Sequence, residues 1–137
     1  MKNDRQYDRK YYVENIVKAK RYLIASIVLA IAGGVYELFS HGVYSYYMIY
    51  AFMIPLLLGC LPYLADTRGF FKRAGSAVEE LLLASIATMT IGSVIKGVLE
   101  IYGTTNTLTA VYPILGAVIL AAVATKMISS YKKQRDA

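Results

Sequence analysis

The chain has little of what a soluble enzyme usually carries. It has one cysteine, Cys60, and one histidine, His41, in 137 residues. A single cysteine excludes an intrachain disulfide, and a single histidine excludes a bis-histidine haem within one chain. No P-loop, dinucleotide-binding glycine fingerprint or cysteine pair is present, and the loops are too short for a separate catalytic domain. We therefore expect no cofactor, and an intramembrane enzyme is a third choice behind a binding and a structural role.

Charge is also scarce, and it is unevenly placed. Charged residues make up 18% of the chain and hydrophobic residues 57%, which is typical of a membrane protein. Four stretches contain no Asp, Glu, Lys or Arg: 22–36, 38–65, 81–95 and 101–125. A helix needs about 20 residues to cross the hydrocarbon core. These stretches predict an all-α membrane protein with four transmembrane helices, at 22–40, 46–65, 80–102 and 109–129.

The basic residues lie on one side of this predicted topology. Fourteen of the fifteen Lys and Arg residues fall in the N-terminal arm, in the middle loop or after residue 125. By the positive-inside rule, both termini and the middle loop are then cytoplasmic. The chain is predicted to be one membrane domain with a basic arm (1–21), a first hairpin (22–65), a cytoplasmic loop (66–79), a second hairpin (80–129) and a basic tail (130–137).

The net charge of +6 predicts a lipid partner rather than a nucleic acid. Anionic headgroups attract each juxtamembrane Lys or Arg by about 1 kcal/mol, and no nucleic-acid-binding motif is present. Residues 7–21 place apolar side chains on one helical side among basic ones, which predicts a short amphipathic interfacial helix before the first span. We expect a multi-pass protein of the cell membrane, as a homo-oligomer or as a subunit of a membrane complex.

A short repeat is the most informative pattern. The segment GVYELF at 34–39 returns 63 positions later as GVLEIY at 97–102. If it reflects a duplication, the two hairpins form a parallel repeat about an axis along the membrane normal. Ala30 and Gly34 correspond to Ser93 and Gly97, a spacing of small residues that lets helices approach closely in lipid. We therefore expect the four spans to form a compact four-helix bundle. The returning helices align poorly, so duplication and chance similarity both stay open.

Each copy of the repeat places a Glu near the outer end of an apolar run, where an ionisable group is costly and indicates a site. Helical spacing puts Glu37 and His41 on one face of the first span, and Lys96 and Glu100 on one face of the third. We predict an outward-facing acidic pocket rimmed by tyrosines, which binds a small polar or cationic ligand in a transporter or an accessory subunit. Its predicted residues are Glu37, Lys96, Glu100, Tyr36, Tyr50, Tyr102, Tyr112 and His41.

Other interpretations compete with this pocket. A salt bridge from Lys96 to Glu37 or Glu100 would only lock the helix bundle, which favours a structural or interaction protein. The tyrosines fit an aromatic belt at the membrane interface equally well. Glu37 and His41 have the spacing of a metal-ligand pair, but no further Cys or Asp lies nearby, so we expect no metal site.

In its size, its four predicted spans and the Glu in the first of them, the chain resembles the small multidrug resistance transporters. The resemblance stops at this gross architecture. Here the Glu lies at the outer end of the span and occurs twice, and the one-sided basic residues are incompatible with dual topology.

Overall fold

The computed structural model describes residues 2–66 and 69–135, with the side chains of residues 9–66, 69–133 and 135. Within these ranges every regular element is helical. Three helices are long: α1 (Lys2–Phe39), α6 (Ser76–Ile101) and α7 (Val111–Arg135). By length and composition each contains a stretch able to cross a membrane, so the chain is a helical protein of the membrane type. The side chains of Lys2, Arg5 and Arg68, which the topology prediction also uses, lie outside the described residues.

Helix α1 runs unbroken for 38 residues, about 57 Å at 1.5 Å per residue. Neither Gly nor Pro occurs between residues 2 and 32, so nothing in the sequence interrupts it. The prediction of a separate interfacial helix at 7–21 is therefore wrong, because these residues continue the axis of the first span. The helix ends at Phe39, beyond which His41 (φ 55°) and Gly42 (φ 89°) take left-handed backbone conformations and turn the chain back.

The second predicted span, 46–65, is interrupted. It consists of α2 (Tyr46–Ile49), a turn at 50–52, α3 (Met53–Pro55), the π-helical stretch η1 (Leu56–Cys60) and α4 (Leu61–Ala65). Pro55 and Pro62 explain the irregularity, because each lacks an N–H and its ring clashes with the carbonyl four residues earlier. The prediction of one continuous helix over 46–65 is therefore wrong.

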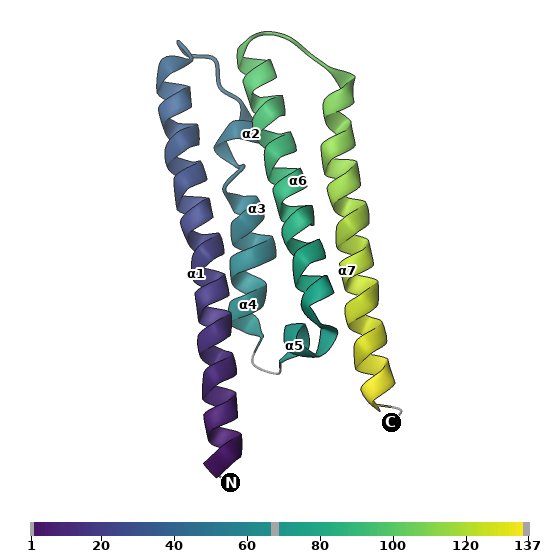
Figure 1. Ribbon diagram of the computed structural model, residues 1–137. Helices are drawn as coiled ribbons and strands as arrows, with labels where there is room; N and C mark the ends of the chain where they lie inside the picture. Colours follow the sequence, from purple (N-terminus) through teal and green to yellow (C-terminus); the bar gives the residue numbers. More distant parts are fainter. Residues whose placement is uncertain (1, 67–68, 136–137) are drawn as a thin grey trace.

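The helices stand in an open row (Figure 1). Helix α1 packs on the interrupted segment, that segment packs on α6, and α6 packs on α7. Helices α1 and α6 run in the same direction, and α7 returns antiparallel to α6 after the short 3-10 helix η2 (Thr107–Ala110). Because α1 and α7 occupy opposite edges of the row, the compact four-helix bundle expected from the sequence is wrong.

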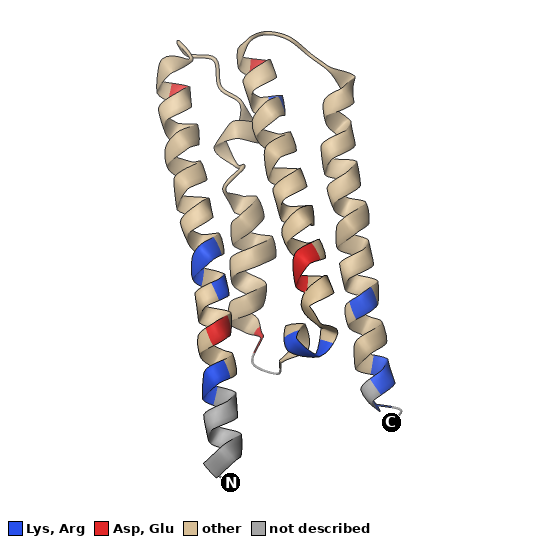
Figure 2. Ribbon diagram, viewed as in Figure 1, with Lys and Arg blue, Asp and Glu red and all other residues tan. Residues whose placement is uncertain are grey.

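The charged residues are segregated along this row (Figure 2). Blue segments on α1, α5 (Phe70–Ala74) and α7 lie toward the end that holds both termini, which we call the basic end. The opposite end, where residues 40–45 and 102–106 turn the chain, is called the loop end. The described basic residues thus lie on one side, as the sequence pattern indicates. Lys96 is the exception, because it lies in the last two turns of α6, near the loop end.

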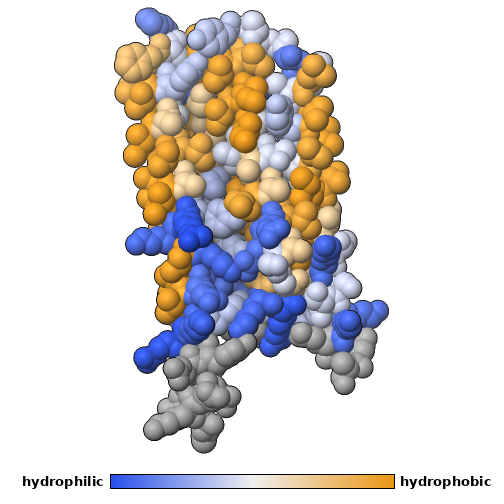
Figure 3. All heavy atoms as spheres, in the orientation of Figure 1, coloured by the Kyte–Doolittle hydropathy of each residue, from blue (hydrophilic) through white to orange (hydrophobic). Residues whose placement is uncertain are grey.

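The packed face of α1 is small or polar, whereas its outer face is large and apolar. On α1 the buried side chains recur at helical spacing and include Asn15, Ala19 and Ser26. Most of its large aliphatic side chains are exposed, and Figure 3 shows apolar side chains over the part of this face away from the basic end. Lipid tails solvate such side chains, and small residues let helices approach in lipid. A layer built in this way suits a bilayer.

The glycines of the repeat pack differently from each other. Gly97 is buried against Met48, whereas Gly34 has open space where a side chain would be. The glycine of α1 that packs on Met48 is Gly33. A Cβ added at Gly33 would lie 3.0 Å from the carbonyl oxygen of Met48. The predicted close approach at Ala30 and Gly34 is therefore wrong, because both residues are on an exposed side of α1.

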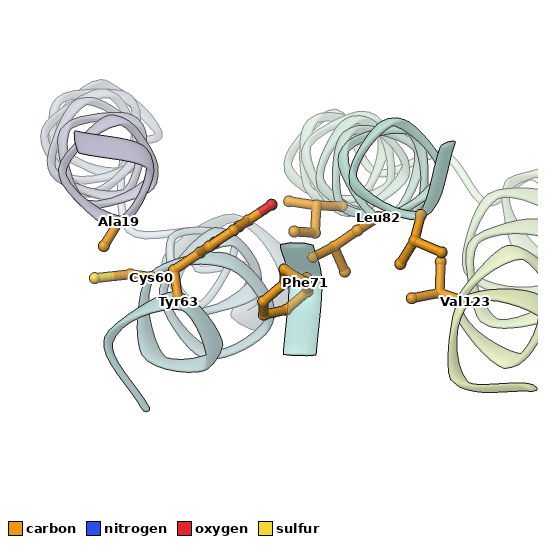
Figure 4. Packing of buried hydrophobic residues seen from close by; sticks show 8 residues of the cluster. Ala19, Cys60, Tyr63, Phe71, Leu82 and Val123 are labelled. Carbon is orange, nitrogen blue, oxygen red and sulfur yellow. The ribbon is translucent and has the colours of Figure 1, made fainter. Parts of the chain in front are cut away.

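An apolar cluster closes the layer near the basic end (Figure 4). Phe71 of α5 stacks on Tyr63 of α4, with ring centres 4.4 Å apart and planes 24° from parallel. Ala19, Leu82 and Val123 bring α1, α6 and α7 into the same cluster. The aromatic side chain of α5 thus points into the protein, and α5 joins elements that are far apart in the sequence.

Asp66 fastens α1 to the start of α5. Its carboxylate accepts hydrogen bonds from the Tyr11 hydroxyl, from Phe70 N–H at 2.8 Å and from Phe71 N–H at 3.2 Å. Its backbone carbonyl accepts a hydrogen bond from Asn15 Nδ2 at 3.1 Å. Burial by itself raises the pKa of Asp66, but the hydrogen bonds from Tyr11, Phe70 and Phe71 outweigh it and hold the pKa below its ordinary value.

Replacing Asp66 with Asn is expected to lower stability by about 1–3 kcal/mol at neutral pH, because the new amide presents N–H groups to a backbone N–H. A depressed pKa contributes stability above the unfolded-state value of about 3.9, and the contribution is lost as the pH falls through the folded-state pKa. The difference between the wild type and D66N should therefore shrink below about pH 4. Unfolding in detergent, followed by circular dichroism from pH 3 to 8, measures this difference in the free energy of unfolding.

Glu14→Gln, at an exposed position, is the matched control. Equal effects of the two variants would contradict the role of Asp66.

Candidate functional site

Helices α1 and α6 are parallel and nearly in register. Toward the basic end, Lys18 Nζ of α1 binds both carboxylate oxygens of Glu79 of α6, at 2.6 and 2.7 Å and across 61 positions. Toward the loop end, Glu37 of α1 and Glu100 of α6 contact one residue between them. Residues separated by about the repeat distance therefore lie at similar levels of the two helices.

Both glutamates of the repeat bind Ser45. Its backbone N–H donates to Glu37 Oε1 at 3.0 Å, and its hydroxyl donates to Glu100 Oε2 at 2.7 Å. Ser45 immediately precedes α2 and is fully buried. The chain reaches this position because the turn after α1 brings it back between α1 and α6. Two carboxylates from distant parts of the sequence are thereby joined through one residue, Glu37 through the Ser45 backbone N–H and Glu100 through the Ser45 hydroxyl.

The carboxylate of Glu37 is only partly satisfied. Its Oε2 atom is buried and has no hydrogen-bond partner among the described residues. A buried polar atom without a partner costs about 1–3 kcal/mol, and more if it is charged. A hydrogen-bond donor or a positive group at this oxygen would therefore stabilise the arrangement.

Lys96 does not supply that group. Its Nζ donates to the Tyr47 hydroxyl at 2.7 Å and lies 3.9 Å from the centre of the Tyr47 ring. Tyr47 is held in turn by Ser93, whose hydroxyl donates to the Tyr47 carbonyl at 2.7 Å. In the part of the chain whose side chains are described, Lys96 forms no ion pair with Glu37 or Glu100. Glu37 and Glu100 therefore share Ser45 as a partner, while Lys96, four positions before Glu100, binds Tyr47 instead.

Three of the other predicted site residues line a cleft that is separate from the Ser45 contacts. Tyr36, His41 and Tyr102 border a cavity of about 680 Å³ formed by the loop-end turns of α1 and α6. Neither Glu37 nor Glu100 is among the residues that line it. The structure thus separates these aromatic residues from the carboxylates with which the sequence grouped them.

The remaining two tyrosines belong to neither place. Tyr50 is exposed at the turn after α2, and its ring stacks with that of Tyr46 at 6.3 Å. Tyr112 packs against α6 at Gly92, where an added Cβ would lie 2.2 Å from the Tyr112 Cβ. The four predicted rim tyrosines are therefore dispersed over the loop-end half of the molecule.

Two residues of the site were not predicted from the sequence. Ser45 lies in the loop before the interrupted segment, and Tyr47 lies in α2, the first helix of that segment. From the sequence we expected a simple loop and a regular helix there. Pro55 and Pro62 were the available signal, because two prolines within one predicted span indicate irregular backbone. No comparable signal identifies Ser45, which becomes a partner of both glutamates only when the loop folds between the helices.

Within residues 9–66 and 69–133, no group of three or more His, Cys, Asp or Glu side chains is placed to hold a metal ion. No protein-family model, curated protein or solved structure matches the chain.

Proposed function

We propose that the chain crosses a cell membrane four times, with both termini in the cytoplasm, and binds a small cationic group at Glu37, Ser45 and Glu100. Three long apolar helices and the interrupted segment beside them support four crossings. The gathering of basic residues at one end supports a cytoplasmic basic end by the positive-inside rule. The site near the loop end would then face outward.

One observation carries the binding proposal. Two carboxylates meet at the buried Ser45, Glu37 Oε2 has no partner, and Lys96 is engaged by Tyr47. A buried carboxylate oxygen without a hydrogen-bond partner is unfavourable. An ammonium group would provide both the missing positive charge and the missing N–H donors, because carboxylates only accept hydrogen bonds when ionised.

The interrupted segment supports a role in transport or as an accessory subunit of a transporter. In many membrane transporters, substrate and ion sites are formed where a helix is discontinuous. Here the break at 50–52 follows α2 directly, and α2 begins at the residue after Ser45. A change in the occupancy of the site would therefore act on the most irregular part of the fold.

A structural role is the second candidate, and the hydrogen bonds of Ser45 favour it specifically. They connect α1, the loop and α6 through partly buried polar contacts. In that interpretation Glu37 and Glu100 only hold the loop, and the protein serves as an interaction partner through its basic arm and tail.

A thermal-stability series distinguishes the two candidates. Methylammonium chloride, used at ten times its Kd, is expected to stabilise the detergent-purified protein by about 1.4 kcal/mol, relative to sodium chloride of equal ionic strength. A double variant, E37Q/E100Q, should lose this response, whereas Glu14→Gln should retain it. If the double variant is less stable and no concentration of methylammonium changes the melting temperature of the wild type, the structural role replaces the binding proposal.

A further inference from the structure

A groove lies between α1 and α6 on the basic side of the Ser45 site. It has a volume of about 470 Å³, within the range of roughly 300–1,000 Å³ that is typical of small-molecule sites. Pro55 and Tyr63 of the interrupted segment line it between the two helices. Its other apolar lining comes from Tyr22, Ala25 and Leu29 of α1 and from Leu83, Ile86, Ala87 and Ile91 of α6.

Charged side chains gather at one end of this groove. Lys18 and Glu79 bind each other across it, so their charges are mutually compensated. Arg21 and Glu80 also line the groove, and both are exposed. Among the described residues neither of them has a hydrogen bond or an ion pair. The mouth therefore offers one unpaired positive and one unpaired negative group.

The position of this pair fits a membrane interface. Arg21 immediately precedes the uncharged stretch 22–36 of α1, and Glu80 immediately precedes the uncharged stretch 81–95 of α6. The groove extends from them along the two apolar stretches toward the loop end, to Leu29 of α1 and Ile91 of α6. A molecule that fills it needs a charged head at one end and an apolar chain beyond.

We propose that the groove binds a phospholipid whose headgroup carries a primary ammonium, with one acyl chain lying between α1 and α6. Arg21 would bind the phosphate, since guanidinium groups form paired hydrogen bonds to phosphate oxygens. Glu80 would accept hydrogen bonds from the ammonium. The proposal shares with the proposed function only the membrane setting, and it uses no residue of the Glu37 and Glu100 site.

Charge complementarity selects this headgroup over the other common ones. A choline headgroup has a positive charge but no N–H to donate to Glu80. An anionic glycerol headgroup satisfies Arg21 and leaves Glu80 facing an uncharged group next to a phosphate. A headgroup with a primary ammonium matches both side chains at once. Its phosphate oxygens accept hydrogen bonds from Arg21, and its ammonium group donates hydrogen bonds to Glu80.

The test uses the delipidated full chain in detergent and measures lipid binding by native mass spectrometry. Phosphatidylethanolamine should bind about tenfold more tightly than phosphatidylcholine or phosphatidylglycerol with the same acyl chains, as the loss of one charge-assisted hydrogen bond predicts. Arg21→Gln and Glu80→Gln should each weaken phosphatidylethanolamine binding by a similar factor. Lys20→Gln and Glu14→Gln, which remove the same charges at exposed positions outside the groove, should leave binding unchanged.

Two further measurements test the acyl-chain part. Ala87→Phe places a ring in the groove and should abolish binding while Arg21 and Glu80 stay in place. Soluble phosphoethanolamine should not compete at the concentration at which the lipid saturates the site. The proposal would be overturned if the three lipids bound equally, or if the control variants lost as much binding as Arg21→Gln and Glu80→Gln. It would also be overturned if phosphoethanolamine alone competed, or if the protein formed a dimer that excludes lipid from the groove.

Discussion

Replacing Gly97 with Ala is expected to destabilise the protein by about 1–3 kcal/mol or more, through overpacking. A Cβ at this position would lie 2.9 Å from both the backbone nitrogen and the Cβ of Met48, and 3.1 Å from its Cα. The N and Cα atoms belong to the backbone of α2 and the Cβ is fixed to it, so no side-chain rotation relieves the contact. Chemical unfolding in detergent, followed by circular dichroism, measures the loss.

Gly34 provides a matched control, because it occupies the same position in the other copy of the repeat. An added Cβ there meets nothing within 4 Å, so Gly34→Ala should be neutral or stabilise α1 by up to about 1 kcal/mol. Equal destabilisation by the two substitutions would contradict the different packing of the two glycines.

Replacing Ser45 with Ala is expected to cost about 1.5–3 kcal/mol, because it removes a hydrogen bond to the Glu100 carboxylate. The methyl group of Ala fits the same space, so the loss reports the hydrogen bond rather than a cavity. Ser40→Ala is the control, since the Ser40 hydroxyl donates only to the Glu37 carbonyl within the same turn and should matter less.

A double-mutant cycle isolates the contact. Ser45→Ala, Glu100→Ala and the combined variant should show a coupling free energy of the same size as the expected hydrogen bond, about 1.5–3 kcal/mol. Additive losses would show that Ser45 and Glu100 act independently, which would remove the link between the two helices on which the site depends.

The class of the fold was predictable because it depends on composition along the chain. Uncharged stretches locate the long helices, and the basic residues gather where the sequence places them. The predictions of a continuous helix over residues 46–65 and of a compact four-helix bundle were wrong. Helix packing in lipid depends on which small residues meet, and Gly33 rather than Gly34 packs on Met48, a difference of one position that periodicity alone does not resolve.

The candidate site was predictable only in its carboxylates. Glu37 and Glu100 were identified by the cost of an ionisable group in an apolar run and by their common frame in the repeat. Their convergence on Ser45 depends on a loop conformation with His41 in a left-handed backbone, which few residues other than Gly adopt. Lys96 was assigned to the carboxylates by helical spacing, but the ring and hydroxyl of Tyr47, from another segment, take its ammonium group.

A row one helix thick has mechanical properties that a bundle lacks. In a closed bundle each helix is braced from two directions, whereas here α1 is braced from one side, by the interrupted segment. Polar contacts join α1 and α6 at two levels, as Lys18 with Glu79 toward the basic end and as Glu37 and Glu100 through Ser45 toward the loop end. As a helix at the edge of the row, α1 is expected to tilt more easily than α6, which packs on neighbours at both sides. Breaking either of the two polar contacts would let α1 pivot about the other, so the width of the groove between α1 and α6 and the contacts at Ser45 would change together while every helix stays intact.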